Sequence, residues 1–239
     1  MQALELVDEP ERGADLLVLV SHAGETTITV EAARAWSGRK WLVTGTGESA
    51  LADLCERVIV CTPALEESFC HTASYTCAVA ALAALRGEDV SRLPESVAAV
   101  LDGDRRWAVG SHERYLVAGA GAAWPTAQEA ALKLREGAHV AAEAHHTEQL
   151  LHGHLAAIDE SVRAFVLVPP GRAGERAADA VRALGELGVQ VESLPCVHPV
   201  VDIVPFQLLT LDLAAARGVD PDQIRRDDER WARARAAYQ

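Results

Sequence analysis

The chain has 239 residues, of which 49% are apolar and 24% charged, and its formal net charge is −13. No run approaches the ~20 consecutive apolar residues of a membrane-spanning helix, and the N-terminus has no signal-peptide pattern. Lys and Arg form no basic stripe, so the attraction that drives nucleic-acid binding is missing. We therefore expect a cytoplasmic globular protein that binds neither membranes nor nucleic acid and holds any anionic ligand with local groups.

Neither the cysteines nor the histidines predict a cofactor. The five cysteines are odd in number and lack the paired C-x-x-C spacing of a zinc or redox site, so we expect reduced thiols. A histidine-rich stretch with Glu148 nearby suggests a metal site, but it lacks the H-x-x-x-H spacing of two ligands on one helix face. We therefore expect no metal. The histidines are His145, His146, His152 and His154.

Short apolar runs rich in β-branched residues alternate with helical patterns along the chain. Parallel strands need crossover connections, which are usually helices, so this alternation predicts an α/β fold with parallel sheets covered by helices. The five predicted strands are residues 16–20, 41–44, 58–61, 115–118 and 165–168.

The strand pattern weakens into a charged, proline-containing stretch between residues 85 and 114. We place a lobe boundary near Asp104, which predicts two lobes, 1–104 and 105–239, each built as strand, Gly- or Ser-rich turn and helix. A Leu- and Ala-rich helix over 206–217 precedes a polar tail. That tail is either solvated or covers a site.

The first predicted strand leads directly into Ser21-His22-Ala23-Gly24-Glu25-Thr26, after which a helical period begins. A hydroxyl-rich turn at a helix N-terminus offers hydroxyl and backbone N–H donors, and the helix dipole favours phosphate there. The alternative is an ordinary helix cap by Ser or Thr.

The predicted strand of the second lobe leads into a second helix. Thr126 and Glu129 have the spacing of a capping box, which predicts the helix start. Glu129, Lys133 and Glu136 then follow at spacings of four and three, so they share one helix face. By itself, this face predicts a salt-bridge ladder more often than a catalytic group.

Four motifs in the correct order resemble the SIS (sugar isomerase) family, and in particular the isomerase domain of glucosamine-6-phosphate synthase. Residues 21–26 resemble the loop S-x-S-G-E-T. Residues 130–136 (AALKLRE) resemble A-L-K-L-K-E, and the segment from Ala142 to Asp159 resembles A-E-A followed by H-G-P-L-A-L-I-D. Residues 204–209 (VPFQLL) resemble V-P-L-Q-L-L. The resemblance covers most of the chain.

The resemblance implies two three-layer α/β/α lobes with parallel sheets and a sugar-phosphate ligand. The phosphosugar-binding residues would be Ser21, His22, Ala23, Thr26 and Thr72. His71 and Thr72 edge the pocket in this interpretation, and a helix cap at Thr72 is the alternative.

The catalytic group implied by the resemblance contains Glu136, Lys133 and His152. Glu136 would move a proton between the first two sugar carbons through an enediol-type intermediate, and His152 would assist ring opening. The family's histidine reaches the site of a neighbouring subunit, which implies a homodimer with a shared active site. A carboxylate and an imidazole can both take and return a proton near neutral pH.

The sequence also departs from the family at several points. Ala23 replaces the second serine of the loop, His154 replaces the proline after His-Gly, and no lysine follows Lys133. We also expect no glutaminase domain with an N-terminal cysteine. These features predict a phosphosugar isomerase or amino-sugar-phosphate deaminase. The alternative is a regulatory module that binds a phosphosugar without converting it.

We expect the first lobe to be shorter at its start than the family's. The family places a strand and a G-x-G-T-S turn before the loop strand, whereas Leu4–Val7 resembles the family's second strand. Loss of a central strand exposes backbone groups and apolar side chains. We expect that the true start lies upstream, that a dimer partner fills the gap, or that the lobe is reduced, and that a lone monomer is unstable.

Overall fold

The computed structural model describes residues 2–9, 13–103 and 106–238 of the chain, which divides into two compact units. Lobe 1 consists of Met1–Glu67 and His71–Ser91, and lobe 2 of Ser68–Cys70 and Arg92–Gln239. The predicted boundary at Asp104 falls outside the described residues. The predicted limits 1–104 and 105–239 therefore stay a prediction.

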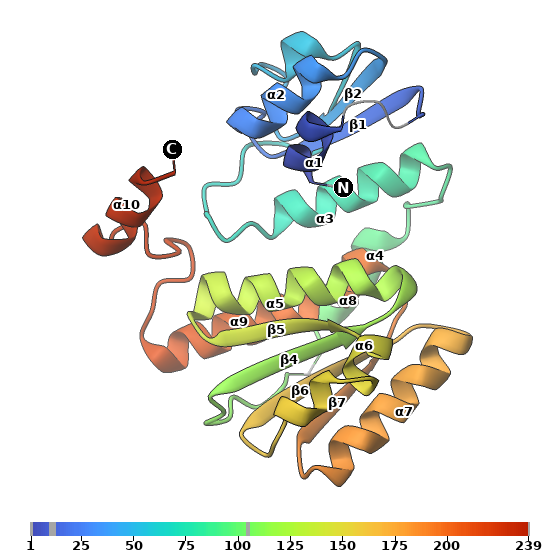
Figure 1. Cartoon of the computed structure of the whole chain (residues 1–239), viewed down its shortest axis with the longest axis vertical. Helices are drawn as coiled ribbons and strands as arrows, with labels where there is room; N and C mark the ends of the chain where they lie inside the picture. Colours follow the sequence, from blue (N-terminus) through green and yellow to red (C-terminus); the bar gives the residue numbers. More distant parts are fainter. Residues whose placement is uncertain (1, 10–12, 104–105, 239) are drawn as a thin grey trace. The chain divides into compact units, whose positions relative to one another are not determined.

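Lobe 1 contains a three-stranded parallel sheet with strand order β1-β2-β3 (Figure 1). Apolar residues opposite one another, such as Leu19 and Leu42, form its core with Val30 and Ala33 of helix α2. Helix α3 contacts β2. The bounds are α1 (Ala3–Asp8), β1 (Leu16–Ser21), α2 (Thr27–Ala35), β2 (Arg39–Thr44), a 3-10 turn (Ala52–Leu54), β3 (Arg57–Val60) and α3 (Ala73–Leu85).

The segment Leu4–Val7, which we expected to be a strand, is part of helix α1. The backbone N–H of Gln2 donates to the Glu5 carboxylate over 3.1 Å, as in a capping box. Leu6 is buried against Ala32 of α2 and Trp36, the C-cap residue of that helix. Local capping and one-sided burial therefore favour a helix, and the strand prediction was wrong.

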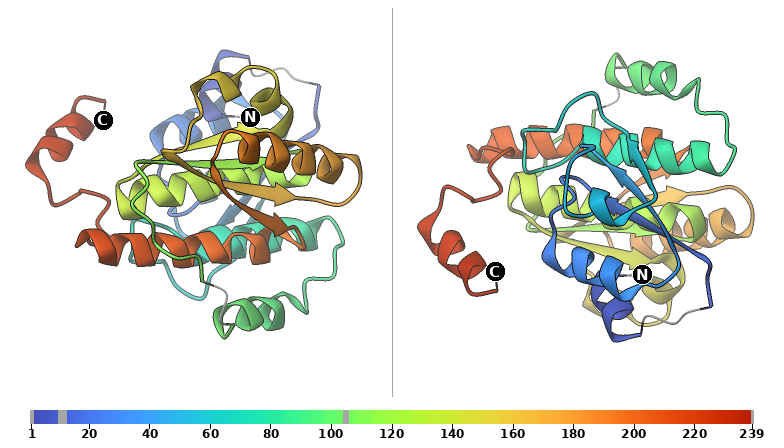
Figure 2. Two further views of the ribbon diagram at one scale, coloured as in Figure 1. Left: turned by 90° about the horizontal axis from the view of Figure 1, so that it is seen from below. Right: turned by 90° about the horizontal axis from the view of Figure 1, so that it is seen from above.

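Lobe 2 contains a four-stranded parallel sheet with strand order β5-β4-β6-β7. Figures 1 and 2 show α7 on one side of this sheet and α5 with α9 on the other. The strands are β4 (Arg114–Gly119), β5 (Ala141–His146), β6 (Val162–Val168) and β7 (Gln190–Pro195). The helices are α4 (Leu93–Leu101), α5 (Trp124–Ala138), α6 (Thr147–Leu151), α7 (Arg172–Glu186), α8 (Pro199–Asp202), α9 (Val204–Arg217) and α10 (Glu229–Ala236).

Alternate residues of the central strands fill two separate cores. On the α7 side, Leu116 and Val166 pack with Ala177 and Leu184. On the other side, the ring of Phe165 lies 5.5 Å from that of Phe206 in α9. Each side of the sheet is thus sealed by a helix, as parallel sheets require.

One stretch of lobe 2, Pro199–Arg217, is long and apolar enough by length and composition to cross a membrane. Of its apolar window, 67% is buried inside the protein. A core helix of a globular domain passes the same test, and α9 packs against α5 in this way.

The five predicted strands are all present as β1, β2, β3, β4 and β6, and the predicted α/β class with parallel sheets is confirmed. Strands β5 and β7 were not predicted. β5 has the sequence Ala-Ala-Glu-Ala-His-His, without a β-branched residue, and forms an edge of its sheet.

The contact between α5 and α9 depends on a glycine. A Cβ added at Gly137 would lie 2.5 Å from Cγ2 of Thr210, and Thr210 is held because its hydroxyl donates to the Phe206 carbonyl over 2.8 Å. We expect Gly137→Ala to lower the free energy of unfolding by about 1–3 kcal/mol, since overpacking forces the helices apart. Chemical denaturation measures the change.

Gly185, in α7, is the matched control because nothing lies within 4 Å of its added Cβ. We expect Gly185→Ala to be neutral or to stabilise by up to about 1 kcal/mol through helix propensity. Equal effects of the two substitutions would contradict close α5–α9 packing.

Candidate functional site

The loop between β1 and α2 is built around a glycine. Gly24 has φ +71°, a left-handed conformation, and its N–H donates to Ser21 Oγ over 3.2 Å. A Cβ at this position would lie 2.1 Å from Ser49 Oγ. Only glycine therefore allows the loop to approach the segment after β2 so closely.

Two further hydrogen bonds hold the same loop, one from that segment and one from the last residue of β2. The backbone N–H of Ala50 donates to the Glu25 carboxylate over 2.9 Å. The Thr44 hydroxyl donates to the His22 carbonyl over 3.0 Å. Glu25 therefore has a structural partner, and the loop is fixed before any ligand arrives.

Thr26 is the N-cap residue of α2, but its side chain makes no capping hydrogen bond. The alternative interpretation, an ordinary helix cap by this hydroxyl, is therefore not what the structure has. The first N–H groups of a helix have no partner within the helix. Those groups, with the hydroxyls of Ser21 and Thr26, are donors that a phosphate accepts readily.

At the start of α3, the carboxylate of Glu66 accepts hydrogen bonds from the first residues of the helix. Its Oε1 accepts from the N–H and the hydroxyl of Thr72, both over 2.8 Å, and its Oε2 accepts from Ser74 N over 2.8 Å. Partial burial acts to raise the pKa of Glu66, but these hydrogen bonds outweigh it and lower the pKa to about 2. Thr72 is the N-cap residue of α3, but its side chain makes no capping hydrogen bond and donates to Glu66 instead.

Two imidazoles lie beside the loop. His22 Nδ1 is 3.0 Å from Ser74 Oγ, and the ring centroids of His22 and His71 are 4.1 Å apart. Lobe 1 therefore brings Ser21, His22 and the start of α3 together. Our sequence interpretation did not assign Ser74 or Glu66 a role. Glu66 lies six residues before Thr72 in the sequence.

In lobe 2, helix α5 carries a lysine enclosed by two carboxylates. Lys133 is only 3% exposed, and its Nζ lies 2.7 Å from Glu136 Oε2 and 3.4 Å from Glu129 Oε1. Burial acts to lower the pKa of Lys133, but Glu129 and the hydrogen bond to Glu136 outweigh it and raise the pKa. Burial raises the pKa of Glu129, against the opposing effect of Lys133.

Of the two carboxylates that pair with Lys133, Glu136 is the more exposed. Its side chain is 26% exposed, whereas that of Glu129 is 15% exposed. The spacing of four and three predicted that these side chains share a face, and the ion pairs follow from it. The predicted capping box was wrong, because α5 begins at Trp124 after the N-cap Ala123, and Glu129 pairs with Lys133 instead of with Thr126.

His152 lies far from this group within the chain. Glu136 precedes the start of β5 and His152 follows its end, and the six residues of β5 span about 17 Å at ~3.3 Å per residue. His152 is 70% exposed, and its Nε2 lies 2.8 Å from Glu148 Oε1. Glu148 also accepts from Arg176 over 2.8 Å, and these contacts lower the pKa of Glu148 to about 2.

The C-terminal tail is attached to lobe 2 beside residues 68–70. Phe69 N donates to the Asp222 carbonyl over 3.0 Å, and the guanidinium carbon of Arg226 lies 3.9 Å from the centre of the Phe69 ring. The tail is therefore not fully solvated. Ile224 and Arg225 have positive φ, which marks a sharp change of direction.

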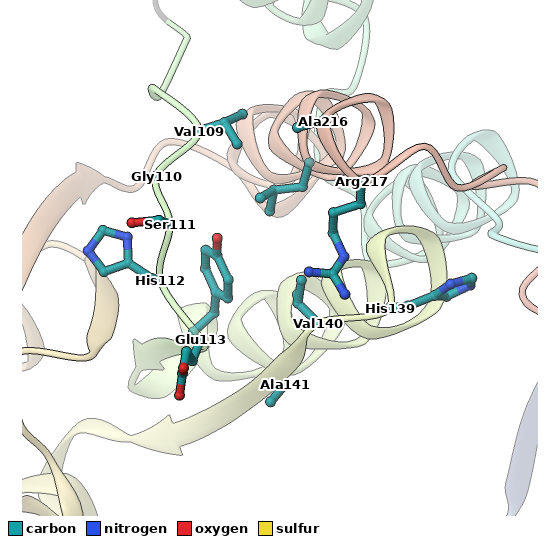
Figure 3. Close-up of a pocket in the computed structure, with 12 residues that line it drawn as sticks. Val109, Gly110, Ser111, His112, Glu113, His139, Val140, Ala141, Ala216 and Arg217 are labelled. Atoms are coloured by element: carbon teal, nitrogen blue, oxygen red, sulfur yellow. The ribbon is translucent and has the colours of Figure 1, made fainter.

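A cavity of about 370 Å³ opens at the amino end of the sheet in lobe 2 (Figure 3). Figure 3 shows the Arg217 side chain reaching into it, between helix α9 and the strand that begins at Ala141. None of the predicted site residues lines this cavity. Within the part of the chain that the structure describes, no group of three or more His, Cys, Asp or Glu side chains could hold a metal ion.

Comparison with a family model finds a match in lobe 2. The model described as "SIS domain" matches residues 110–217. The match spans the sheet and helices α5 to α9, including Lys133, Glu136 and His152.

Similar curated proteins extend the likeness to both lobes. The chain is 28% identical over 265 residues to a glutamine–fructose-6-phosphate aminotransferase [isomerizing] of Gloeobacter violaceus, and 30% identical over 247 residues to the one of Methanothermobacter thermautotrophicus. These alignments cover 90% and 87% of the chain, but only 44% and 42% of the relatives. The chain thus spans less than half the length of these relatives.

Solved structures share the fold at lower identity. Glucosamine-6-phosphate deaminase from Thermotoga maritima matches with a TM-score of 0.76 and 22% identity, over 92% of this chain and 77% of that one. Tagatose-6-phosphate ketose/aldose isomerase from Escherichia coli matches with a TM-score of 0.79 and 18% identity, over 93% and 75%. The α/β fold with parallel sheets is therefore shared with these structures.

Removing the Glu66 charge tests the cap of α3 beside the loop between β1 and α2. We expect Glu66→Gln to lower the free energy of unfolding by about 1–2 kcal/mol at pH 7, because N–H groups at the helix start lose a charged acceptor. Since the folded-state pKa lies below the usual value of 4.5, this stabilisation is present above that value and is lost as pH falls toward 2.

Urea unfolding of wild type and Glu66→Gln from pH 7 to pH 3.5 measures the difference between their free energies of unfolding. This difference should become smaller below about pH 5. Glu67→Gln is the control, because Glu67 is exposed and adjacent. A difference that is independent of pH, or an equal effect at Glu67, would contradict the charged cap.

Proposed function

We propose that this protein is a phosphosugar aldose–ketose isomerase or amino-sugar-phosphate deaminase. The similar proteins named above are an isomerizing aminotransferase, a deaminase and a ketose/aldose isomerase of sugar 6-phosphates, and the SIS domain model matches within lobe 2. The single observation that carries the proposal is the ion pair of Lys133 with Glu136, which combines a buried cation with a partly exposed carboxylate.

The phosphate of the sugar would bind at the loop of lobe 1. Ser21 and Thr26 offer hydroxyls, the start of α2 offers N–H groups, and the dipole of α2 favours a negative charge. His22 and Ala23 line the same loop. Thr72 would act indirectly, because its hydroxyl and N–H are engaged by Glu66.

Glu136 would act as the proton shuttle. Its carboxylate would remove the proton from the second sugar carbon, leaving an enediol-type intermediate, and return it to the first carbon while the hydroxyl and carbonyl exchange places. The ammonium of Lys133 would hold the Glu136 carboxylate in position through its hydrogen bond. No oxidant or cofactor enters this balance.

His152 would complete the site of a second subunit. Within one chain, β5 separates it from Glu136, so a site that needs both residues requires two copies of the chain. Its exposed imidazole would transfer a proton during ring opening, and Glu148, bonded to Arg176, would orient it. We therefore propose a homodimer with shared active sites.

A second candidate function is a binding or regulatory module that recognises a phosphosugar without converting it. Two features of the sequence favour it: Ala23 removes one loop hydroxyl, and no lysine follows Lys133. A panel of hexose and amino-hexose 6-phosphates separates the two functions. Thermal stabilisation without isomer or ammonia would favour the binding module.

Replacing the proposed shuttle tests the enzymatic function. We expect Glu136→Gln to lower turnover by about 100-fold or more on any panel member that wild type converts, because acid–base catalysis is lost. Product formation by NMR measures the rate. Glu186→Gln, on exposed α7 in the same lobe, is the control, and unchanged turnover by Glu136→Gln would refute the assignment.

Mixing two inactive variants tests the shared site. In an equal mixture of Glu136→Gln and His152→Ala subunits, half of the dimers are mixed and each holds one intact site, so activity should return to about a quarter of wild type. The separate variants should stay inactive after the same exchange treatment. No recovery despite proven subunit exchange would contradict the shared site.

A further inference from the structure

The cavity at the amino end of the lobe 2 sheet lies apart from the residues assigned to the proposed reaction. Its walls come from the segment before β4, the start of β5 and the last turn of α9, all within lobe 2 (Figure 3). Its volume of about 370 Å³ lies within the range of small-molecule sites, roughly 300–1,000 Å³. The cavity is therefore large enough for a small organic ligand.

A cation reaches into this cavity without a charged partner. Arg217 is the last residue of α9, and Figure 3 shows its side chain between that helix and the start of β5. Its guanidinium forms no ion pair or hydrogen bond with the residues that the structure describes, whereas the buried Arg163 is paired with Glu192 over 3.5 Å. A guanidinium is always charged in proteins and offers a planar fork of N–H donors. Arg217 is therefore free to bind an oxyanion.

A buried hydroxyl group lines the same cavity. Tyr115 is only 2% exposed, and its hydroxyl forms no hydrogen bond with a described residue. Burial raises the pKa of Tyr115, against the opposing effects of Arg163 and Arg217. The phenol therefore stays protonated near neutral pH and can donate. Because buried polar groups are almost always hydrogen-bonded, an unpartnered hydroxyl beside an unpaired cation marks a place for an acceptor.

Positive charge acts on the cavity wall, although the chain has a formal net charge of −13. Burial and two nearby cations, Arg225 and Arg217, lower the pKa of His139. Asp227 opposes them. The carboxylate in the lining is that of Glu113, which is exposed, and Figure 3 shows it apart from the Arg217 guanidinium. Water screens an exposed charge, so the balance of charge favours an anion.

Much of the remaining wall is apolar and includes Val140 and Leu213. Apolar surface gains free energy when a carbon body covers it, which an inorganic ion cannot do. The rings of His112 and His139 point away from the Arg217 guanidinium in Figure 3, so we assign neither of them a contact. The wall therefore suits a ligand that joins an oxyanion to a partly apolar body.

We propose that this cavity binds a small organic anion, whose carboxylate or phosphate pairs with Arg217 and accepts from the Tyr115 hydroxyl. The carbon body of the anion packs on Val140 and Leu213. This site is separate from the loop between β1 and α2 in lobe 1, and the inference does not rest on the proposed function. Arginine suits both head groups, because its fork of donors matches the oxygens of carboxylate and phosphate alike.

Methyl NMR with two probes tests binding and identifies the head group. Benzoate and phenyl phosphate attach a carboxylate or a phosphate to the same ring, and benzyl alcohol is the uncharged match. We expect one or both anions to shift the methyl signals of Val140 and Leu213 to saturation. Benzyl alcohol should bind about tenfold or more weakly, because it lacks the charge-assisted hydrogen bonds. The anion that binds more tightly identifies the preferred head group.

Two charge substitutions should act differently on the same titration. Arg217→Gln removes the cation, and we expect it to weaken binding by about tenfold or more. Glu113→Gln removes a repelling charge and should leave binding unchanged or strengthen it by up to about fivefold. Tyr115→Phe keeps the ring and should weaken binding by about threefold or more. Arg172→Gln is the matched control, because Arg172 is exposed and paired with Glu175 on α7.

Two kinds of result would overturn the inference. If neither anion moves these methyl signals, or if only signals of lobe 1 move, the cavity does not bind such a ligand. If benzyl alcohol binds as tightly as the anions, or if Arg217→Gln weakens binding no more than Arg172→Gln does, the cavity is an apolar pocket without an anion site. No turnover is measured, so the proposed function and this inference stand or fall separately.

Discussion

A lysine that is 3% exposed can remain charged only if its charge is balanced, and this constraint organises helix α5. Lys133 has carboxylates on the turns before and after it, at spacings of four and three, so one helix face carries the whole ion group. Helix α5 also packs closely on α9, which is possible because Gly137 has no side chain. Gly137 follows Lys133 by four residues, so the ion group and this close contact lie on the same side of the helix.

In lobe 1, a partly buried negative charge, the Glu66 carboxylate, is likewise balanced by its neighbours. Glu66 occupies the start of α3, where its carboxylate satisfies the free N–H groups, while the start of α2 has no side-chain cap. One helix start is therefore capped by a side chain of the protein, and the other has no side-chain cap. Sequence motifs do not distinguish these two cases, because both segments contain hydroxyl residues near a helix N-terminus.

The sequence predicted the parallel α/β fold because apolar runs such as 115–118 are buried on both faces and need no tertiary context to be recognised. It did not predict β5, whose small and polar residues form an edge strand only because β4 pairs with them. Leu4–Val7 was misassigned because a short apolar segment suits either a strand or a helix, and its packing on α2 decides. The pairing of Lys133 with Glu136 follows from helical spacing, whereas the contact of His22 with Ser74 joins residues 52 positions apart.

The most direct measurement of the central claim is NMR of a bound hexose 6-phosphate in D₂O. Proton transfer by Glu136 through an enediol-type intermediate predicts the isomeric sugar phosphate, deuterium at the first or second carbon, or both, and their loss in Glu136→Gln. A sugar phosphate that binds wild type with neither isomer nor deuterium appearing would contradict the account.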